Sequence, residues 1–284
     1  MDLSVVIPCL NEVETISKCI KKAKKEIEKL DIDAEIIVSD NGSNDGSIEL
    51  SKSLGAKVIH VMEKGYGVAV YNGIKSSQGK YIIIADADDS YNFEDLTIFY
   101  KKILEGYDIV QGCRMPSGGG KIEKNAMPKS HQYIGNPFFS FICKIFFSLP
   151  FNDVYCGMKI LRKDFYKNID FFSNGMVFCI EILIKSIVSN AKVSEIPIKL
   201  YKDGRKLSKS HLRTLHDGLA TLKFILICCP KWIYFVPAFL FFFFSFIIFF
   251  SLNIYPDLKF YNIVLSSLIM IYLSFQLFIL GLFT

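Results

Sequence analysis

Two long stretches without a charged residue near the C-terminus constrain this 284-residue chain most. The first, Ile233–Leu252, includes four consecutive phenylalanines, and the second runs from Tyr261 to Thr284. An α-helix rises about 1.5 Å per residue, so about 20 residues cross the roughly 30 Å hydrocarbon core of a bilayer. We therefore expect two transmembrane helices joined by the short polar turn 253–259. The alternative is a buried hairpin in a soluble protein, where uncharged runs of this length are rare.

The remainder of the chain has the composition of an ordinary globular domain. After Trp232 only Asp257 and Lys259 carry charge, so charged residues are concentrated in the first 232 positions, where they make up about a quarter of the residues. This pattern excludes a disordered chain, a disulfide-stabilised miniprotein and a wholly soluble enzyme. We expect three parts: a globular domain over 1–210, a juxtamembrane amphipathic helix over 211–232 and a transmembrane hairpin over 233–284.

The distribution of basic residues predicts how the chain is oriented in the membrane. Those that precede the first apolar run are Arg205, Lys206, Lys209, Arg213, Lys223 and Lys231. Only Lys259 lies between the two runs, so the positive-inside rule places the globular domain in the cytoplasm. Met1 leads directly into an apolar segment without a basic region or a cleavage site, and we expect no signal peptide. The eight cysteines form no CxxC pair and are expected to be reduced core residues.

Strands and helices alternate along the first part of the globular domain. Apolar periodicity predicts strands at Leu3–Ile7, Ala34–Val38, Lys57–Val61 and Tyr81–Ala85, and helices at Glu12–Leu30, Ser47–Leu54 and Val68–Ser76. Continuous apolar strands alternating with amphipathic helices indicate an α/β domain with a mostly parallel, Rossmann-like sheet. In such sheets ligands bind outside the carboxyl ends of the strands.

Acidic residues follow three of the predicted strands at that edge. The first strand ends in Pro8-Cys9-Leu10-Asn11-Glu12, the second in Asp40-Asn41-Gly42-Ser43-Asn44-Asp45-Gly46, and the fourth in Asp86-Ala87-Asp88-Asp89-Ser90. Carboxylates gathered in one place repel one another unless a cation compensates them, and divalent cations prefer carboxylate and phosphate oxygens. We expect a metal and nucleotide site here. The alternative is that Asp88–Ser90 cap a helix that begins near Phe93.

Other nucleotide and metal sites do not fit the sequence. Gly65-Tyr66-Gly67 resembles the start of a dinucleotide-binding motif but lacks its third glycine and follows the third strand. The chain contains no P-loop motif, no GxSxG and no HExxH, and its four histidines lack metal-ligand spacing.

Taken in order, these segments resemble the motif series of family 2 glycosyltransferases with the GT-A fold. The resemblance covers residues 3–229 and extends through Gly112-Cys113-Arg114, Cys156-Gly157-Met158-Lys159 and Ile196-Pro197-Ile198. Within that family, the chain is most similar to dolichol-phosphate mannosyltransferases and polyprenyl-phosphate glycosyltransferases. The 1–210 part is then identified as a GT-A glycosyltransferase domain.

The resemblance implies roles for the acidic strand ends. The nucleotide would be bound by Pro8, Asn11, Glu12, Asp40 and Asp86. Asp86 and Asp88 would hold Mg²⁺ or Mn²⁺ against the diphosphate, and Asp88 would be catalytic. Such a metal acts as a Lewis acid on the departing nucleoside diphosphate.

The acceptor side is expected to contain cations. A lipid phosphate is already anionic, so it needs positioning rather than a general base, and arginine suits phosphate geometry. The resemblance implies Arg114 and Arg205 as catalytic and acceptor-binding residues, with Lys209 and Glu181 also on the acceptor side. One departure is that Lys206-Leu207 stand where relatives often have glycine.

Two further segments are expected to face the membrane. Pro137–Leu149 carries a single charge and fits either a core helix or an interfacial helix that delivers lipid. His211–Leu226 is a basic amphipathic stretch expected to lie along the bilayer and lead into the first span.

The expected activity is that of an inverting glycosyltransferase. It would move glucose or mannose from a UDP- or GDP-sugar to a polyprenyl or dolichyl phosphate at the cytoplasmic membrane face. One alternative is a polysaccharide-type enzyme with a sugar acceptor, although its usual Gln-x-x-Arg-Trp motif is missing. Another is a non-catalytic membrane scaffold. The net charge of +5 fits anionic lipid rather than nucleic acid, and a homo-oligomer is left open.

Overall fold

The computed structural model of the protein describes residues 1–205, 214–254 and 260–283. Contacts between Cα atoms divide the chain into two compact units, Met1–Thr221 and Leu222–Thr284. The first unit is an α/β domain and the second consists mainly of long apolar helices. The three-part division expected from composition, with boundaries at 210 and 232, stays a prediction.

A seven-stranded sheet forms the centre of the first unit, in the order β3-β2-β1-β4-β7-β5-β8. Its strands are β1 (Leu3–Cys9), β2 (Ala34–Asp40), β3 (Lys57–His60), β4 (Tyr81–Ile84), β5 (Ile109–Cys113), β7 (Lys159–Arg162) and β8 (Val193–Pro197). Strand β7 runs antiparallel to both of its neighbours, β4 and β5, and every other pair is parallel. The predicted mostly parallel α/β sheet is therefore confirmed.

The first strand is longer than predicted, because Pro8 does not end it. Strand β1 pairs with β2 as far as Cys9 opposite Asp40, whereas its pairing with β4 stops at Val6 opposite Ile84. Proline lacks a backbone N–H and is tolerated where one side of a strand has no partner. The unpaired side lets the strand continue to the ligand-binding edge.

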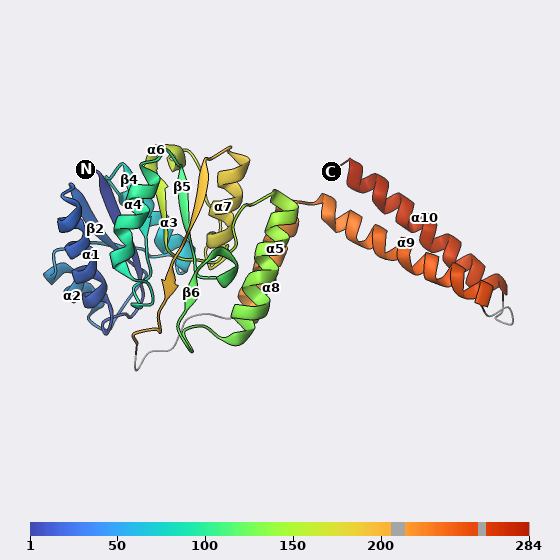
Figure 1. Ribbon diagram of the computed structural model, residues 1–284, viewed down its shortest axis with the longest axis horizontal. Coiled ribbons are helices and arrows are strands. Elements are labelled where there is room, and N and C mark those ends of the chain that lie inside the picture. The colour runs from blue at the N-terminus through green and yellow to red at the C-terminus, as the bar shows by residue number, and fades with distance from the viewer. Residues whose placement is uncertain (206–213, 255–259, 284) are drawn as a thin grey trace. The chain divides into compact units, whose positions relative to one another are not determined.

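Helices cover both faces of this sheet (Figure 1). Alternate β1 residues point to opposite faces: Val5 joins the core formed with helices α1 (Ile16–Leu30) and α4 (Leu96–Ile103). Val6 lies against Gly73 of α3 (Tyr66–Ser76), and α3 in turn contacts α7 (Phe178–Val188). Short elements complete the unit: α2 (Ser47–Ser53), η1 (Phe93–Asp95), η2 (Pro116–Gly118), α6 (Lys163–Tyr166) and a ribbon of β6 (Lys121–Ile122) and β9 (Lys199–Leu200).

One helix of the first unit carries apolar side chains on its solvent side. A π-helical turn, η3 (His131–Gly135), leads into α5 (Asn136–Phe147), which corresponds to the predicted Pro137–Leu149 segment. The buried positions of α5 are small or polar, whereas five large apolar side chains of η3 and α5 are exposed: Tyr133, Ile134, Phe138, Phe141 and Ile145. A core position for this whole segment is therefore wrong. We call these five residues the α5 stripe.

The second unit contains the two predicted apolar helices, α9 (Lys231–Ile254) and α10 (Phe260–Leu282), after α8 (Thr214–Cys228), which begins in the first unit. Within the pair, Ser274 Oγ donates to the Ala238 carbonyl at 2.8 Å and Ser245 Oγ to the Ser267 carbonyl at 3.1 Å. The segments Lys231–Phe250 and Tyr261–Leu282 are long and apolar enough to cross a membrane, with mean hydropathies of 2.5 and 2.3. Most of the predicted turn 253–259 lies outside the described residues.

Close packing of α3 on β1 gives a test of the fold. A Cβ atom at Gly73 would lie 2.3 Å from Val6 Cγ1, so Gly73→Ala should lower the free energy of unfolding by about 1–3 kcal/mol. Thermal unfolding in detergent measures the change. Gly175→Ala is the control, because its Cβ would meet open space. Equal melting temperatures for the two variants would contradict this packing.

Candidate active site

The loops after β1 and β2 are tied to each other by side chains. Asn11, which adopts a positive φ of 57°, receives the Asn44 N–H on Oδ1 at 2.9 Å. Its own N–H donates to Ser43 Oγ at 2.9 Å. The buried Asp40 carboxylate accepts the N–H groups of Gly42 and Ser43 at 3.0 and 3.1 Å. Of the predicted nucleotide residues, Asn11 and Asp40 therefore shape the loops, and Pro8 is buried in β1.

Asn41, which the sequence did not single out, joins this edge to the loop before α3. Its Nδ2 donates to the Glu63 carbonyl at 2.7 Å, and its Oδ1 accepts the Gly65 N–H at 2.7 Å. In the sequence, its place between Asp40 and Gly42 suggests only a turn after the strand, which is a weak signal for these contacts. The result is that the Gly65-Tyr66-Gly67 turn is fixed beside the ends of β1 and β2.

Asp86 lies just after β4 in a crowded position. Tyr66 Oη donates to its Oδ1 at 2.9 Å. A Cβ atom at Gly157 would lie 2.5 Å from Oδ2, so only glycine fits there without displacing the carboxylate. Burial, together with the neighbouring Asp88, raises the pKa of Asp86 to about 6, against the opposing effects of Tyr66, Lys159 and Arg114. Asp86 is thus enclosed by α3 and by the loop before β7.

Asp88 presents its two oxygens to different partners. Oδ1 accepts the Ser90 N–H at 3.0 Å and the Ser90 hydroxyl at 2.6 Å. Oδ2 lies 3.7 Å from Arg205 Nη2. The capping alternative is wrong for Asp88, since the helical turn at Phe93 is capped by Asn92, whose Oδ1 accepts the Glu94 N–H at 3.2 Å. Burial raises the pKa of Asp88.

Arg205 brings the predicted acceptor side against the predicted nucleotide side. Its Nη1 lies 3.0 Å from Glu12 Oε1, and its Nε donates to both oxygens of Asp203 at 2.9 Å. Burial raises the pKa of Glu12 to about 7 even though Arg205 opposes the shift. Asp203 was not predicted, and only its position two residues before Arg205 could have suggested the pairing. The structure therefore collects Glu12, Asp88 and Arg205 in one place.

Arg114 has a different environment, because its guanidinium forms an ion pair with the buried carboxylate of Asp153. Nε and Nη2 donate to the two oxygens of Asp153 at 2.7 and 2.9 Å, and the Arg114 backbone N–H donates to Oδ2 at 3.0 Å. Its Nη1 lies 3.5 Å from the Tyr91 hydroxyl, which accepts the Gly157 N–H at 2.8 Å. These contacts link β5 to the loop beneath Asp86. Asp153 and Tyr91 were not predicted.

Glu181 supports a loop through both of its oxygens. They accept the N–H groups of Phe172 and Ser173 at 2.9 and 2.8 Å, and Lys185 Nζ lies 2.6 Å away. Burial alone would raise the pKa of Glu181, but these hydrogen bonds lower it. The next residue of the loop, Asn174, accepts the Gly67 N–H at 2.9 Å. Glu181 thus helps to hold the loop that contacts the turn before α3. Lys209, the other residue predicted on the acceptor side, lies outside the described residues.

The acidic cluster can be compared with what a divalent cation requires. In the described ranges no three His, Cys, Asp or Glu side chains are arranged to hold a metal ion by themselves. Mg²⁺ usually takes only one or two carboxylates and completes its shell with water and substrate phosphates. Asp88, whose Oδ2 faces Arg205 Nη2 at 3.7 Å, and the nearby Asp86 fit that mode, with a nucleotide supplying the remaining ligands.

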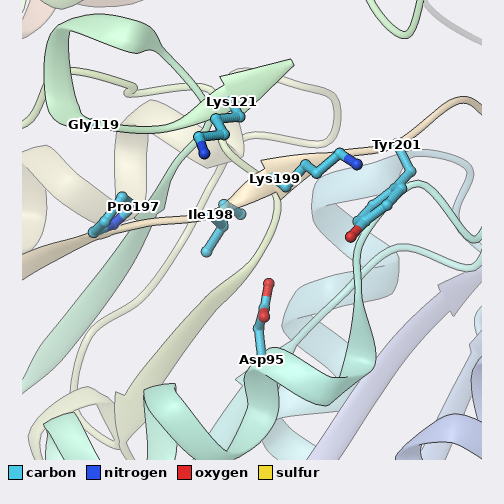
Figure 2. A pocket seen from close by; sticks show the side chains of 7 residues that line it. All are labelled: Asp95, Gly119, Lys121, Pro197, Ile198, Lys199 and Tyr201. Carbon is cyan, nitrogen blue, oxygen red and sulfur yellow. The ribbon is translucent and has the colours of Figure 1, made fainter. Parts of the chain in front are cut away.

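A hollow of about 270 Å³ lies elsewhere, between η1 and the β6–β9 ribbon. Figure 2 shows Lys121 and Lys199 on one wall and Asp95 on the other, with Tyr201 at one end. None of the predicted site residues lines it. Lys199 of β9 and Tyr201 both line it, so the hollow adjoins the start of the 201–205 segment that carries Arg205.

The burial of the Arg114–Asp153 pair gives a test of what Arg114 does. Arg114→Gln leaves the fully buried Asp153 carboxylate without its cation, which should cost about 3–5 kcal/mol of folding free energy. Thermal unfolding should reveal this loss, whereas Lys102→Gln, which breaks the exposed pair with Glu105, should change stability by less than about 1 kcal/mol. An unaltered melting temperature with lost turnover would instead assign Arg114 a direct contact with substrate.

Comparisons with known proteins agree with this geometry. The model of the family described as glycosyl transferase family 2 matches residues 4–170. The chain is 31% identical over 238 residues to the low-salt glycan biosynthesis hexosyltransferase Agl6 of Haloferax volcanii, covering 84% of this chain and 56% of that protein. It is 28% identical to the dolichyl-phosphate hexose transferase of the same organism, covering 80% of this chain and 94% of that protein.

Solved structures show the same fold. Glucosyl-3-phosphoglycerate synthase from Mycobacterium tuberculosis, in complex with Mn²⁺, UDP and glucosyl-3-phosphoglycerate, superposes with a TM-score of 0.60 at 18% identity, covering 81% of this chain and 80% of that one. The fold is therefore GT-A, as the motif series implied. With the family model matching more than half of its residues, the chain belongs to glycosyl transferase family 2 and is a glycosyltransferase.

Proposed function

We propose that the protein transfers a hexose from a nucleoside diphosphate sugar to a polyprenyl or dolichyl phosphate, with inversion at the anomeric carbon. The observation that carries this proposal is the meeting of acidic and cationic side chains at one sheet edge, where Glu12 and Asp88 face Arg205. A chain with two helices able to span a membrane has ready access to a lipid acceptor. Glucose or mannose, carried by UDP or GDP, is the proposed donor sugar.

On the donor side, Pro8, Asn11, Glu12 and Asp40 are proposed to surround the nucleoside. Asp86 and Asp88 would hold Mg²⁺ or Mn²⁺, which when bound neutralises charge on the leaving diphosphate. The structural relatives from M. tuberculosis have been crystallised with UDP and either Mn²⁺ or Mg²⁺. The tight fit of Gly157 and Tyr66 around Asp86 supports a fixed orientation of that carboxylate.

On the acceptor side, the chemistry needs cations and no general base. An oxygen of the lipid phosphate forms a bond to the anomeric carbon while the bond from that carbon to the nucleoside diphosphate breaks, so one displacement inverts the configuration. The acceptor is already anionic near neutral pH and loses no proton. Arg205 and Lys209 are proposed to position it. Arg114 and Glu181 are proposed to support the site from beneath through Asp153 and the 172–174 loop.

The exposed apolar side chains of the first unit support a lipid acceptor rather than a soluble one. The α5 stripe presents five large apolar side chains to solvent within the first unit. Exposed apolar patches often mark sites that contact a membrane or another protein. Such a stripe suits the interfacial region of a bilayer. A relative matched over 94% of its length is named a dolichyl-phosphate hexose transferase. We propose that the protein is integral to the membrane, with its first unit in the cytoplasm as the basic flank predicts.

A direct assay tests the proposal. The full chain in detergent, supplied with labelled UDP-glucose or GDP-mannose, Mg²⁺ and a polyprenyl phosphate, should form a labelled lipid. The matching polyprenol without phosphate should give no product, because the phosphate is the nucleophile. Glycosylation of free sugars instead, with no lipid product from any common donor, would favour the polysaccharide-type alternative.

Two neighbouring aspartates allow a matched test of the metal role. Asp88→Asn should lower turnover about a hundredfold or more, since loss of a metal ligand removes several kcal/mol of charge stabilisation. Asp89→Asn is the control, because Asp89 pairs with Lys22 at 2.5 Å and asparagine tolerates its positive φ of 61°. Turnover is measured as labelled lipid formed per minute. A near-normal rate for Asp88→Asn would remove the metal role.

The raised pKa values predict how metal binding depends on pH. Asp86 and Glu12 have pKa values of about 6 and about 7, so both lose protons as the pH rises from 5 to 8. Because the ionised carboxylates attract cations, the affinity for Mn²⁺ should increase over that interval and level off above pH 8. Titration of the free Mn²⁺ signal by electron paramagnetic resonance measures it. Asp86→Asn should flatten the lower part of the profile, and a flat profile for the unaltered protein would contradict the assignment.

A further inference from the structure

Arg205 is enclosed by carboxylates from three separate segments. They are Glu12 from the loop after β1, at 3.0 Å, Asp88 from the loop after β4, at 3.7 Å, and Asp203 from its own segment. The Arg205 side chain is only 6% exposed. A surface arginine would sample many rotamers in water, whereas this one is held between carboxylates that include Asp88, one of the two residues proposed to hold the metal.

The segment that carries Arg205 is itself attached to the loop that carries Asp88. The Gly204 N–H donates to the Asp88 carbonyl at 2.8 Å. A Cβ atom at Gly204 would lie 3.1 Å from Thr15 Cγ2 and 3.2 Å from Asp89 Cβ, so the backbone packs closely on both neighbours. The position of the guanidinium therefore follows from backbone contacts as well as from charge.

The oxygen of Asp88 that faces Arg205 is the one a metal ion would need. Oδ1 is already occupied by the backbone and side chain of Ser90. In the part of the chain that the structure describes, Oδ2 has Arg205 as its charged partner. A guanidinium and a divalent cation repel each other strongly at separations of a few ångströms in a poorly hydrated site. Both cannot share this oxygen.

We propose that Arg205 is an internal counter-ion, which neutralises Asp88 and Glu12 until a divalent cation arrives with its nucleoside diphosphate and displaces it. This rests on the proposed function, which assigns the metal to Asp86 and Asp88. Displacement makes the guanidinium available to a second anion, the acceptor phosphate. The site then acquires its acceptor-binding cation only after the donor is bound, so the donor adds first and the lipid second.

Competition between Arg205 and the metal can be measured without any turnover. The probe is Mn²⁺ alone, with the full chain in detergent and the free ion followed by electron paramagnetic resonance. Arg205→Gln should bind Mn²⁺ about tenfold more tightly than the unaltered protein, a factor within the usual range for coupled sites. A residue that merely held the loop in place would weaken metal binding when removed, which is the opposite sign.

Lys22→Gln is the matched control. It removes the same charge from the same region, but Lys22 pairs with Asp89 at 2.5 Å and makes no ion pair with Glu12 or Asp88 in the described residues. Its Mn²⁺ affinity should stay within about twofold of the unaltered protein, since exposed charges are well screened. Equal tightening in both variants would reduce the effect to net charge and overturn the proposal.

Thermal unfolding provides a second measurement in case Arg205→Gln folds poorly. Without metal, the variant leaves three carboxylates facing one another and should melt below the unaltered protein. Saturating Mn²⁺ should raise its melting temperature more than that of the unaltered protein, because no internal cation has to be displaced. Equal Mn²⁺ affinities and equal thermal shifts would overturn the competition and leave the proposed function standing. Failure of all the proteins to bind Mn²⁺ would also overturn the metal assignment itself.

Discussion

Electrostatic repulsion between carboxylates at the carboxyl edge of the sheet is the constraint on which the site depends. Parallel strands β1, β2 and β4 all end there, so their acidic residues are brought together by topology alone. Each is compensated differently. Asp40 accepts two backbone N–H groups, Asp86 accepts a tyrosine hydroxyl, and Glu12 and Asp88 share the guanidinium of Arg205. Glu12 and Asp88 therefore depend on one shared cation, and Asp88 is one of the two carboxylates proposed to hold the metal.

Local patterns were enough to predict the first half of the domain. The alternation of apolar strands and amphipathic helices predicted that β1 to β4 are parallel, and the shared edge of their acidic ends followed from it. The same was true of α9 and α10, because an uncharged run of about 20 residues has few other interpretations. These strands and helices depend mainly on residues close to one another in the sequence, so local patterns are enough to predict them.

Features that depend on distant residues could not be predicted in this way. The antiparallel insertion of β7 between β4 and β5 has no local signature, because the residues of a four-residue strand do not indicate whether it pairs in parallel or antiparallel. Arg114 was predicted as a catalytic and acceptor-binding residue, but its guanidinium pairs with Asp153, which lies 39 residues away in sequence. Glu12 and Arg205 are 193 residues apart. Pairings of this kind are decided by tertiary packing.

The position of β7, β8 and Arg205 in the chain has a consequence for biosynthesis. Domains form from the N-terminus as the chain is made, but here the floor of the site requires Gly157 and its cationic wall requires Arg205. The first apolar helix begins at Lys231, only a short distance further along. The segment that completes the site is therefore synthesised late, directly before the apolar helices. A nascent chain that stops before this segment would have the acidic strand ends without the guanidinium that compensates Glu12 and Asp88.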